Sequence, residues 1–163
     1  MSSVNFESVS MKPKYLTRTQ YKAWRSFHLM RTRLLGHLVK RLFKHSGITE
    51  AEYIILIVLY ESKKSVRIKE MSQMINWEIS RLSHQITRME AVGLVQKQVC
   101  VEDSRRFEIT ITEKGKNLIQ KAFPLQELEI KHCFGDILTE SQLNSLIEIS
   151  GVICTHLKEK HDC

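Results

Sequence analysis

The sequence has 163 residues, of which 42% are hydrophobic and 26% charged, and this composition indicates a folded globular protein rather than a disordered one. No apolar run approaches the roughly 20 residues that a membrane helix needs, and the first residues lack the apolar segment of a secretory signal, so we expect a cytoplasmic protein. The net charge of +7 favours a polyanionic partner, because excess positive charge attracts polyanions.

The first part of the chain is predicted to be a loose leader, residues 1–14, followed by a first helix over residues 15–46 that ends at Gly47. Every charged residue from Lys12 to Lys44 is a cation. The basic side of this helix either contacts phosphates beside a binding site or is a solvated surface, and the pattern is compatible with both. Its apolar stripe consists of Leu16, Tyr21, Trp24, Phe27, Leu34, Leu35, Leu38 and Leu42.

Residues 47–75 predict two further helices. Thr49 and Glu52 have the spacing of a capping box, so a helix begins here, and its body from Tyr53 to Tyr60 is apolar almost all round, which is typical of a central core helix. A polar break over residues 62–66 separates it from a short helix over residues 68–75, which turns Ile68, Met71 and Ile75 inward.

Residues 76–93 predict an amphipathic helix that could read DNA, introduced by a turn at Asn76 and Trp77 and closed by a left-handed Gly93. Its apolar stripe is formed by Ile79, Leu82, Ile86 and Met89. The opposite face carries donors and acceptors long enough to reach base edges and phosphates, namely Ser80, Arg81, His84, Thr87 and Arg88, with Ser83 and Gln85 at its flanks.

A basic β-hairpin is predicted next, with arms over residues 94–100 and 106–112 around a charged tip of Glu102, Asp103, Ser104 and Arg105. A core helix, a short helix, a tight turn, a polar-faced helix and a hairpin follow one another in the order of a winged helix-turn-helix, which we assign to residues 47–112. The plain alternative is a surface helix packed on a small sheet.

Residues 113–163 predict two long amphipathic helices. The first follows Thr112 and runs to about Phe134, with Pro124 expected to kink it, and the second begins at a capping box formed by Thr139 and Gln142. We expect these helices and the first helix to pair two copies into a homodimer, whose two heads would bind a pseudo-palindrome. The fold class is therefore mainly α with a small β-hairpin, a DNA-binding winged helix-turn-helix flanked by dimerisation helices.

The chain resembles the multiple-antibiotic-resistance regulator (MarR) family over roughly residues 15–160, most specifically in the runs ITEAEYIILIVLYES and RIKEMSQMINWEISRLSHQITRMEAVGLVQKQVCVEDSRRFEITITEKG. The resemblance implies a dimeric winged-helix repressor, or less often an activator, of a pseudo-palindromic DNA operator. In the family pattern an aspartate two residues before an arginine marks the wing, and here these are Asp103 and Arg105. Asp103 would orient Arg105 into the minor groove, whose negative potential favours arginine, and Arg106 would contact phosphate.

The resemblance places Arg81, Ser83, His84 and Arg88 where family members contact bases and phosphates, although the family commonly has threonine and arginine in place of Ser83 and His84. We predict that Arg81 reads guanine and that His84 and Gln85 reach neighbouring base edges. The register on the phosphates would be set by Ser83, Arg88, Lys69 and Lys97, with Ser80 as a further DNA contact.

Regulation by a small molecule or a redox signal is what the resemblance implies, acting between the dimerisation helices and the reading head. An apolar pocket for such an effector would be lined by Tyr21, Trp24, His28, Tyr53 and Tyr60, unless these aromatic residues only pack in the core. The four cysteines have no framework spacing, so we expect reduced thiols. Cys100 lies in the basic wing, where nearby arginines can acidify a thiol, and it is either a redox sensor or an inert small hydrophobe. The C-terminal Cys154, His156, His161 and Cys163 match no standard zinc motif, so we expect no metal and no cofactor.

Enzyme function is not expected, because the sequence contains no glycine-rich phosphate loop, no nucleophile elbow and no His-Glu-x-x-His helix. The competing function is that of a winged-helix module that docks another protein without specific DNA readout, since a fold alone does not fix a function. The two differ in salt response, because binding through several phosphates weakens steeply as salt rises.

Overall fold

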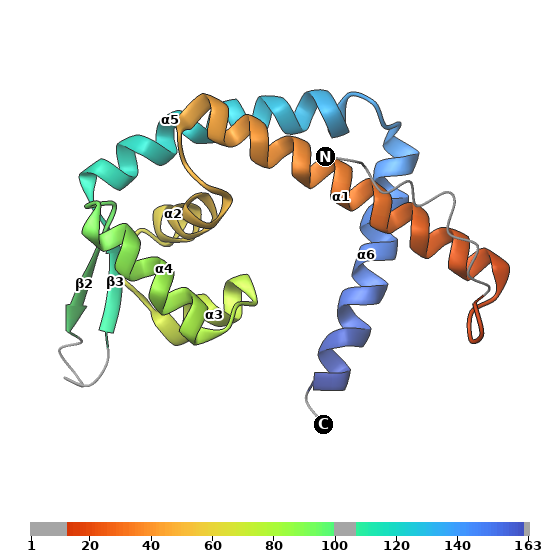
Figure 1. Ribbon diagram of the computed structural model, residues 1–163, viewed down its shortest axis with the longest axis horizontal. Helices are drawn as coiled ribbons and strands as arrows, with labels where there is room; N and C mark the ends of the chain where they lie inside the picture. Colours follow the sequence, from red (N-terminus) through yellow and green to blue (C-terminus); the bar gives the residue numbers. More distant parts are fainter. Residues whose placement is uncertain (1–12, 100–106, 162–163) are drawn as a thin grey trace. The chain divides into compact units, whose positions relative to one another are not determined.

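The computed structural model describes residues 13–99 and 107–161, and it is mostly helical with a small antiparallel sheet (Figure 1). The chain divides into two compact units, residues 1–37 and 38–163. Within the described ranges, no helix combines the length and the apolar character that crossing a membrane requires. The expected class, mainly α with a small β-hairpin, is confirmed.

The first unit contains most of helix α1 (Arg18–Ser46), which begins at Arg18 and not at the expected residue 15. Thr17 and Gln20 cap its start reciprocally, because the Thr17 N–H donates to Gln20 Oε1 at 2.8 Å and the Gln20 N–H donates to Thr17 Oγ1 at 3.2 Å. The Trp24 ring lies 6.0 Å from the Phe27 ring, and both side chains are exposed in the single chain.

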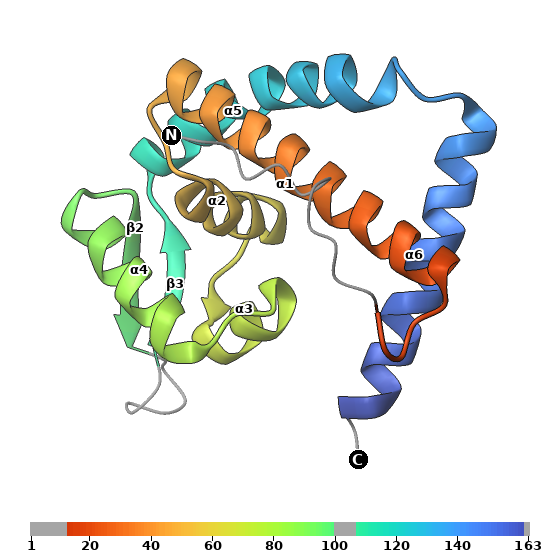
Figure 2. The same cartoon turned by 45° about the vertical axis from the view of Figure 1, so that its right-hand side comes forward.

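The core of the second unit is built around helix α2 (Glu50–Ser62), which packs against α4, α5 and β3. The predicted capping box is confirmed: the Thr49 hydroxyl accepts from the Glu52 N–H, and the Glu52 carboxylate accepts from the Thr49 N–H. Ile55, Leu56 and Leu59 are buried, as expected of a central core helix. Figures 1 and 2 show α2 below α5 and above α3 and α4, with the strands to one side.

The sheet has three antiparallel strands in the order β1 (Val66–Arg67), β3 (Phe107–Ile111) and β2 (Val95–Val99). The hairpin arms are confirmed as β2 and β3, with Lys97 opposite Ile109. Strand β1 was not predicted, because its two residues fall where the expected polar break meets the short helix, but Val66 pairs with Ile109 and is buried. The central strand β3 thus has a paired neighbour on both sides.

Helices α3 (Ile68–Ile75) and α4 (Ile79–Ala91) lie against each other, and α4 also packs on β2. The bounds of α3 agree with the prediction. Gly93 follows α4 with a φ of +72°, which confirms the left-handed residue expected there.

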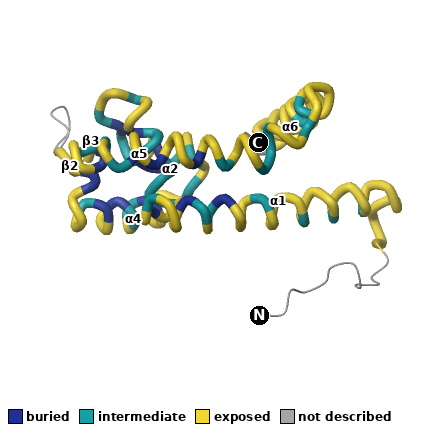
Figure 3. Tube along the Cα trace, turned by 90° about the horizontal axis from the view of Figure 1, so that it is seen from above, coloured by how far each residue is buried: buried dark blue, intermediate teal, exposed yellow. Residues whose placement is uncertain are grey.

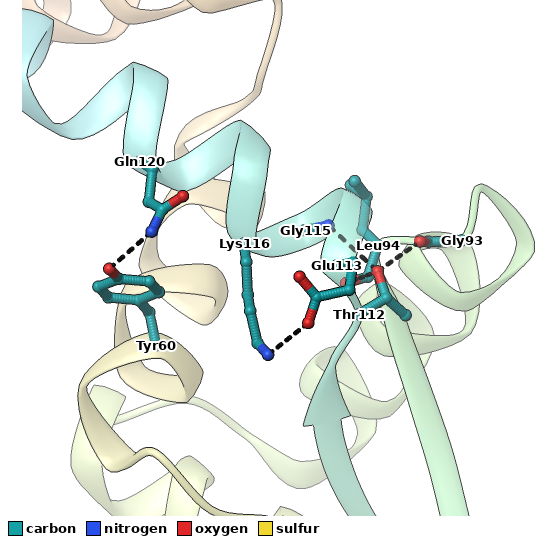
Figure 4. A network of polar contacts seen from close by, with 8 residues as sticks. All are labelled: Tyr60, Gly93, Leu94, Thr112, Glu113, Gly115, Lys116 and Gln120. Atoms are coloured by element: carbon teal, nitrogen blue, oxygen red, sulfur yellow. Dashed lines mark hydrogen bonds and ion pairs between the residues drawn. The ribbon is translucent and has the colours of Figure 1, made fainter.

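Helix α5 (Glu113–Ile130) is joined directly to the turn between α4 and β2 (Figure 4). The Thr112 hydroxyl accepts from the Gly115 N–H at 3.1 Å and donates to the Gly93 carbonyl at 2.7 Å. A Cβ on Gly115 would stand 2.2 Å from the Leu94 carbonyl oxygen, so only glycine permits this approach. Pro124 lies inside α5. The α-helix ends at Ile130 and not at the expected Phe134, because a π-helical turn, η2 (Lys131–Gly135), follows Ile130.

Helix α6 (Glu140–His161) begins at the predicted second capping box, since the Gln142 N–H donates to Thr139 Oγ1 and the Thr139 N–H donates to Gln142 Oε1. From Glu140 to Glu159 no side chain of this helix is buried. Buried side chains occur in each of the helices α1 to α5 and in the three strands, whereas Figure 3 draws α6 as exposed or intermediate. The exposed apolar side chains of α6 are Ile147, Ile149, Val152, Ile153 and Leu157.

Candidate nucleic-acid interface

The turn between α3 and α4 is held by backbone and side-chain hydrogen bonds that set the direction of α4. Asn76 adopts a left-handed conformation with a φ of 53°, and its N–H donates to the Gln73 carbonyl at 3.4 Å. The Trp77 N–H donates to the Ser72 carbonyl at 3.0 Å, and the Ser72 hydroxyl donates to the Trp77 carbonyl at 2.7 Å. Asparagine is among the residues that tolerate this conformation best, so the local sequence favours the turn.

The two faces of α4 differ sharply in exposure. Leu82, Ile86 and Met89 are fully buried in the core of the second unit. Because these three residues anchor one side of the helix, the polar side must face outward. The side chains at Ser80, Arg81, His84, Thr87 and Arg88 are exposed, while Ser83 and Gln85 are intermediate. The predicted outward face of this helix is thus observed, whereas the contacts that each side chain makes with DNA stay a prediction.

Arg81 lies over the indole ring of Trp77, with its guanidinium carbon 4.0 Å from the ring centroid. Trp77 is half-buried and packs against the core. A cation at this distance from an aromatic face is attracted by the negative charge of the π-system. The guanidinium of Arg81 therefore lies next to the ring, although the side chain is exposed.

A groove of about 480 Å³ runs between the first turns of α3 and α4 and the start of β3. Lys69 and Ser83, both predicted phosphate contacts, lie in this groove and are brought together by the fold. Its complete lining is Arg67, Ile68, Lys69, Glu70, Gln73, Ile79, Ser83 and Phe107.

Ile79 corrects the expected apolar stripe of α4, because its side chain is 50% exposed and lines the same groove. Ile79 is the first residue of α4, where the core that covers Leu82 and Ile86 does not reach. The helical period places it on the apolar side but does not say how far along the helix the core extends. Sequence reasoning therefore missed an apolar side chain on the outer surface of the helix.

Lys97 is tied to the C-terminal half of α4. Its ammonium lies 2.8 Å from Thr87 Oγ1 and 3.1 Å from Glu90 Oε2, and its backbone N–H donates to Glu90 Oε1 at 3.0 Å. The backbone hydrogen bond from Lys97 and the nearby ammonium lower the pKa of Glu90, because both stabilise the carboxylate. The start of the wing is therefore braced against α4.

The outer edge of the sheet carries a second polar cluster. The Ser65 hydroxyl donates to Glu108 Oε2 at 2.5 Å, and Arg67 Nε lies 3.5 Å from Glu108 Oε1, so β1 is joined to β3 through side chains as well as through its backbone. The wing residues Asp103, Arg105 and Arg106, and the redox candidate Cys100, lie outside the described residues.

The residues expected to form an effector pocket are distributed over both units. Tyr21, Trp24 and His28 belong to the first unit, where the Trp24 and His28 rings are 6.2 Å apart. In the second unit Tyr53 packs against the core, and burial raises its pKa, with smaller contributions from Glu127 and Glu61.

Tyr60 is the remaining member of this set, and its hydroxyl oxygen accepts a hydrogen bond from Gln120 Nε2 at 3.0 Å (Figure 4). Its ring lines an apolar cavity of about 240 Å³ between α2 and α5. A pocket built from all five aromatic residues stays a prediction. Across residues 13–99 and 107–161, no group of three or more potential metal ligands is found.

The antiparallel sheet, the α3–turn–α4 pair and the outward polar face of α4 together define a winged helix-turn-helix protein. A family model described as "Transcriptional regulator SarA/Rot" matches residues 37–122. AbsC, a MarR family transcriptional regulator from Streptomyces coelicolor, has a similar structure with a TM-score of 0.84 and 32% identity, over 90% of this chain and 99% of AbsC. This chain therefore belongs to the MarR family of winged-helix transcriptional regulators, which confirms the resemblance noted in the sequence.

Two further proteins extend the comparison. Sco3205, a MarR family transcriptional regulator from Streptomyces coelicolor whose structure is a complex with DNA, has a TM-score of 0.83 and 29% identity over 88% of this chain and 94% of its own. The organic hydroperoxide resistance transcriptional regulator of Bacillus subtilis (strain 168) is 31% identical over 83 residues, which are 51% of this chain. The match spans 56% of the length of that relative.

Proposed function

We propose that this chain is a sequence-specific DNA-binding repressor that acts as a homodimer and places α4 in the major groove. The observation that carries the proposal is the orientation of α4, which seals Leu82, Ile86 and Met89 in the core and exposes Arg81 and the other polar residues of its opposite face. The similarity to Sco3205, whose structure was solved with DNA, supports the same use of this fold.

The base contacts would come from the first half of α4. Arg81 would donate in pairs to the O6 and N7 atoms of guanine, and His84 and Gln85 would reach neighbouring base edges. Ile79, exposed at the first position of α4, would contact the methyl group of a thymine, because apolar side chains recognise that group in the major groove.

The phosphate contacts would come from around the groove and from the wing. Lys69, Ser80, Ser83 and Arg88 are exposed or intermediate, as contacts to the DNA backbone require. An ammonium carries three N–H donors, so a phosphate contact by Lys97 would use a donor beyond the two that it shares with Thr87 and Glu90. Asp103, Arg105 and Arg106 would act at the minor groove and the adjacent phosphates, as the family pattern implies.

A homodimer is supported by the apolar surface of α6. Ile147 and Val152 are 70% and 67% exposed in the single chain, and Ile149, Ile153 and Leu157 are exposed as well. Water-exposed apolar area of this extent on one helix is typical of an interface with another chain. Two copies related by a two-fold axis would present two α4 helices to a pseudo-palindromic site.

The proposal also includes release of the protein from DNA by a small molecule or by a redox signal. The cavity beside Tyr60 is lined by apolar side chains of α2 and α5 and a few polar groups, which suits a small apolar effector. The name of the Bacillus subtilis relative, a regulator of organic hydroperoxide resistance, supports a peroxide as the alternative signal, sensed by Cys100. Peroxide treatment of the wild type and of Cys100→Ser, followed by a DNA-binding titration, separates the two: equal behaviour of both proteins excludes the thiol.

The test of DNA recognition is selection of bound fragments from random DNA, followed by titration of Arg81→Ala against the selected and a scrambled sequence. The variant should lose about 1 to 3 kcal/mol on the selected sequence and much less on the scrambled one, because only a base contact carries sequence information. Lys121→Ala, which removes an exposed cation from α5, is the matched charge control. Equal losses on both sequences would make Arg81 a backbone contact.

The salt dependence tests the competing function as a protein-docking module. Binding to the selected DNA should weaken by roughly 1,000-fold or more between 50 and 200 mM salt if six or more phosphates are contacted. Failure of the selection to enrich any sequence, together with binding that does not depend on salt, would support the docking module and reject the repressor.

A further inference from the structure

We infer that Trp77 is a positioning residue for sequence recognition, which holds the guanidinium of Arg81 in place before DNA is bound. This inference rests on the proposed DNA binding, and it assigns to Trp77 a role that does not require the indole itself to touch a base. The observation behind it is the contact between the two side chains, with the guanidinium carbon 4.0 Å from the centre of the indole ring.

The indole is a fixed platform, because three separate contacts hold the residue that carries it. The Trp77 N–H donates to the Ser72 carbonyl at 3.0 Å, and the Trp77 carbonyl accepts from the Ser72 hydroxyl at 2.7 Å. The ring itself packs against the core of the second unit. Asn76 precedes Trp77 and has a left-handed conformation, so the backbone turns at this point and the indole lies beside the first turn of α4.

Arg81 needs such a platform, since its long side chain has several rotatable bonds and is exposed to solvent. Among the residues that the structure describes, no carboxylate forms an ion pair with Arg81, so the aromatic contact is the restraint found there. An arginine whose guanidinium carbon lies over a ring face leaves N–H donors on the edges of its planar group free to bind other acceptors. Those donors are the ones that a guanine would accept in pairs.

The physical consequence is a lower entropic cost of recognition. A guanidinium that is already restrained loses less rotamer freedom when it binds a guanine, and the gain applies only where a guanine is present. Trp77 should therefore raise the discrimination between the correct and an incorrect sequence and leave non-specific binding to phosphates nearly unchanged. Loss of a purely structural tryptophan would instead weaken binding to all sequences together with the stability of the fold.

The experiment is a double-variant cycle in the full chain, with the selected and the scrambled DNA as probes. Trp77→Leu should lower the ratio of the two affinities by about 2- to 5-fold, the range expected of an exposed cation–π contact. Arg81→Ala should lower the ratio by about 5- to 150-fold, and adding Trp77→Leu to Arg81→Ala should lower it no further. Trp77→Phe, which keeps an aromatic face, should restore most of the discrimination.

A second measurement does not depend on the folding of any Trp77 variant. The sequence contains two tryptophans, so a protein labelled with 5-fluorotryptophan gives two fluorine resonances. Trp24→Phe removes one of them, and the remaining resonance is thereby assigned to Trp77. In the protein without DNA, Arg81→Ala should shift the Trp77 resonance, whereas Arg88→Ala should not.

The outcomes separate the inference from the proposed function. Failure of the wild type to enrich any sequence rejects the proposed function and, with it, the inference. Enrichment by the wild type combined with unchanged discrimination in Trp77→Leu, or with no shift of the Trp77 resonance in Arg81→Ala, overturns the inference alone. An equal effect of Trp77→Leu in the presence and absence of Arg81 would also overturn it.

Discussion

The winged helix-turn-helix, residues 47–112, here called the head, and helix α6 are both rich in aliphatic residues, but they place them in opposite ways. In the head Ile55, Leu56 and Ile86 have no exposed surface, whereas in α6 the side chains of Ile147 and Val152 are mostly exposed. The head therefore contains the apolar contacts that stabilise it, while α6 offers apolar surface that a further chain could cover. The difference teaches that hydrophobic periodicity alone identifies a face and does not say whether that face packs within one chain or between two.

The largest effect should come from the sealed core. Leu56→Ala should lower the free energy of unfolding by about 2 to 5 kcal/mol, because the truncation leaves a cavity among fully buried neighbours. Urea denaturation followed by circular dichroism measures this loss. An equal loss of unfolding free energy in Leu157→Ala of α6, at a protein concentration too low for association, would contradict the contrast between the two regions.

The next effect should appear in the association of two chains. Ile147→Ala should weaken a homodimer by about 2 to 4 kcal/mol, since a symmetric interface loses the same apolar side chain twice. Sedimentation equilibrium of the wild type and the variant gives the dissociation constants, with Glu148→Ala on the same helix as control. A wild type with the mass of one chain at all concentrations would contradict the homodimer.

A matched pair of helix caps sharpens the comparison. Thr112→Ala should cost about 1 to 2 kcal/mol, because its hydroxyl caps α5 and also donates to the Gly93 carbonyl. Thr139→Ala, which removes only an exposed cap of α6, should cost about 0.5 to 1 kcal/mol. Thermal unfolding of both variants provides the measurement, and the reverse order of the two losses would speak against the head as the more tightly coupled region.

The smallest effect concerns pH and the brace between the wing and α4. The pKa of Glu90 is lowered by the Lys97 backbone N–H and ammonium, so its contribution to stability is present above the ordinary value of 4.5 and is lost as the pH falls through the lower folded value. Glu90→Gln should remove this acid-dependent part, and Glu113→Gln at the exposed start of α5 is the control. If the stability of Glu90→Gln and of the wild type depended on pH in the same way, the contact between Glu90 and Lys97 would not contribute to stability.

Much of the fold follows from local patterns in the sequence. The capping boxes at Thr49 and Thr139 place the starts of α2 and α6, because each requires only a hydroxyl and a partner three residues later. The period of Leu82, Ile86 and Met89 orients α4 and so predicts which side chains face outward. These signals depend on neighbours within one or two helical turns, which a sequence displays directly.

Features that depend on distant partners could not be predicted in this way. Strand β1 has only two residues and exists because Val66 pairs with Ile109, which lies far along the chain. Ile79 has the spacing of a core residue, but the core ends before it reaches the first residue of α4. The contact of Trp77 with Arg81 could be predicted only in part. The sequence shows that the two residues are four positions apart, but the orientation of the ring depends on Ser72 and the core.

The close approach at Gly115 has a mechanical consequence. A side chain at this position would meet the Leu94 carbonyl and Ile111, and the neighbouring Thr112 and Lys114 bond to the carbonyls of Gly93 and Val92. No compressible layer of side chains separates the first turn of α5 from the root of the wing, and packed protein is stiff. A displacement of this end of α5 must therefore move the beginning of β2 as well. The junction couples the two elements rigidly, so that movement of the helix is transmitted to the hairpin.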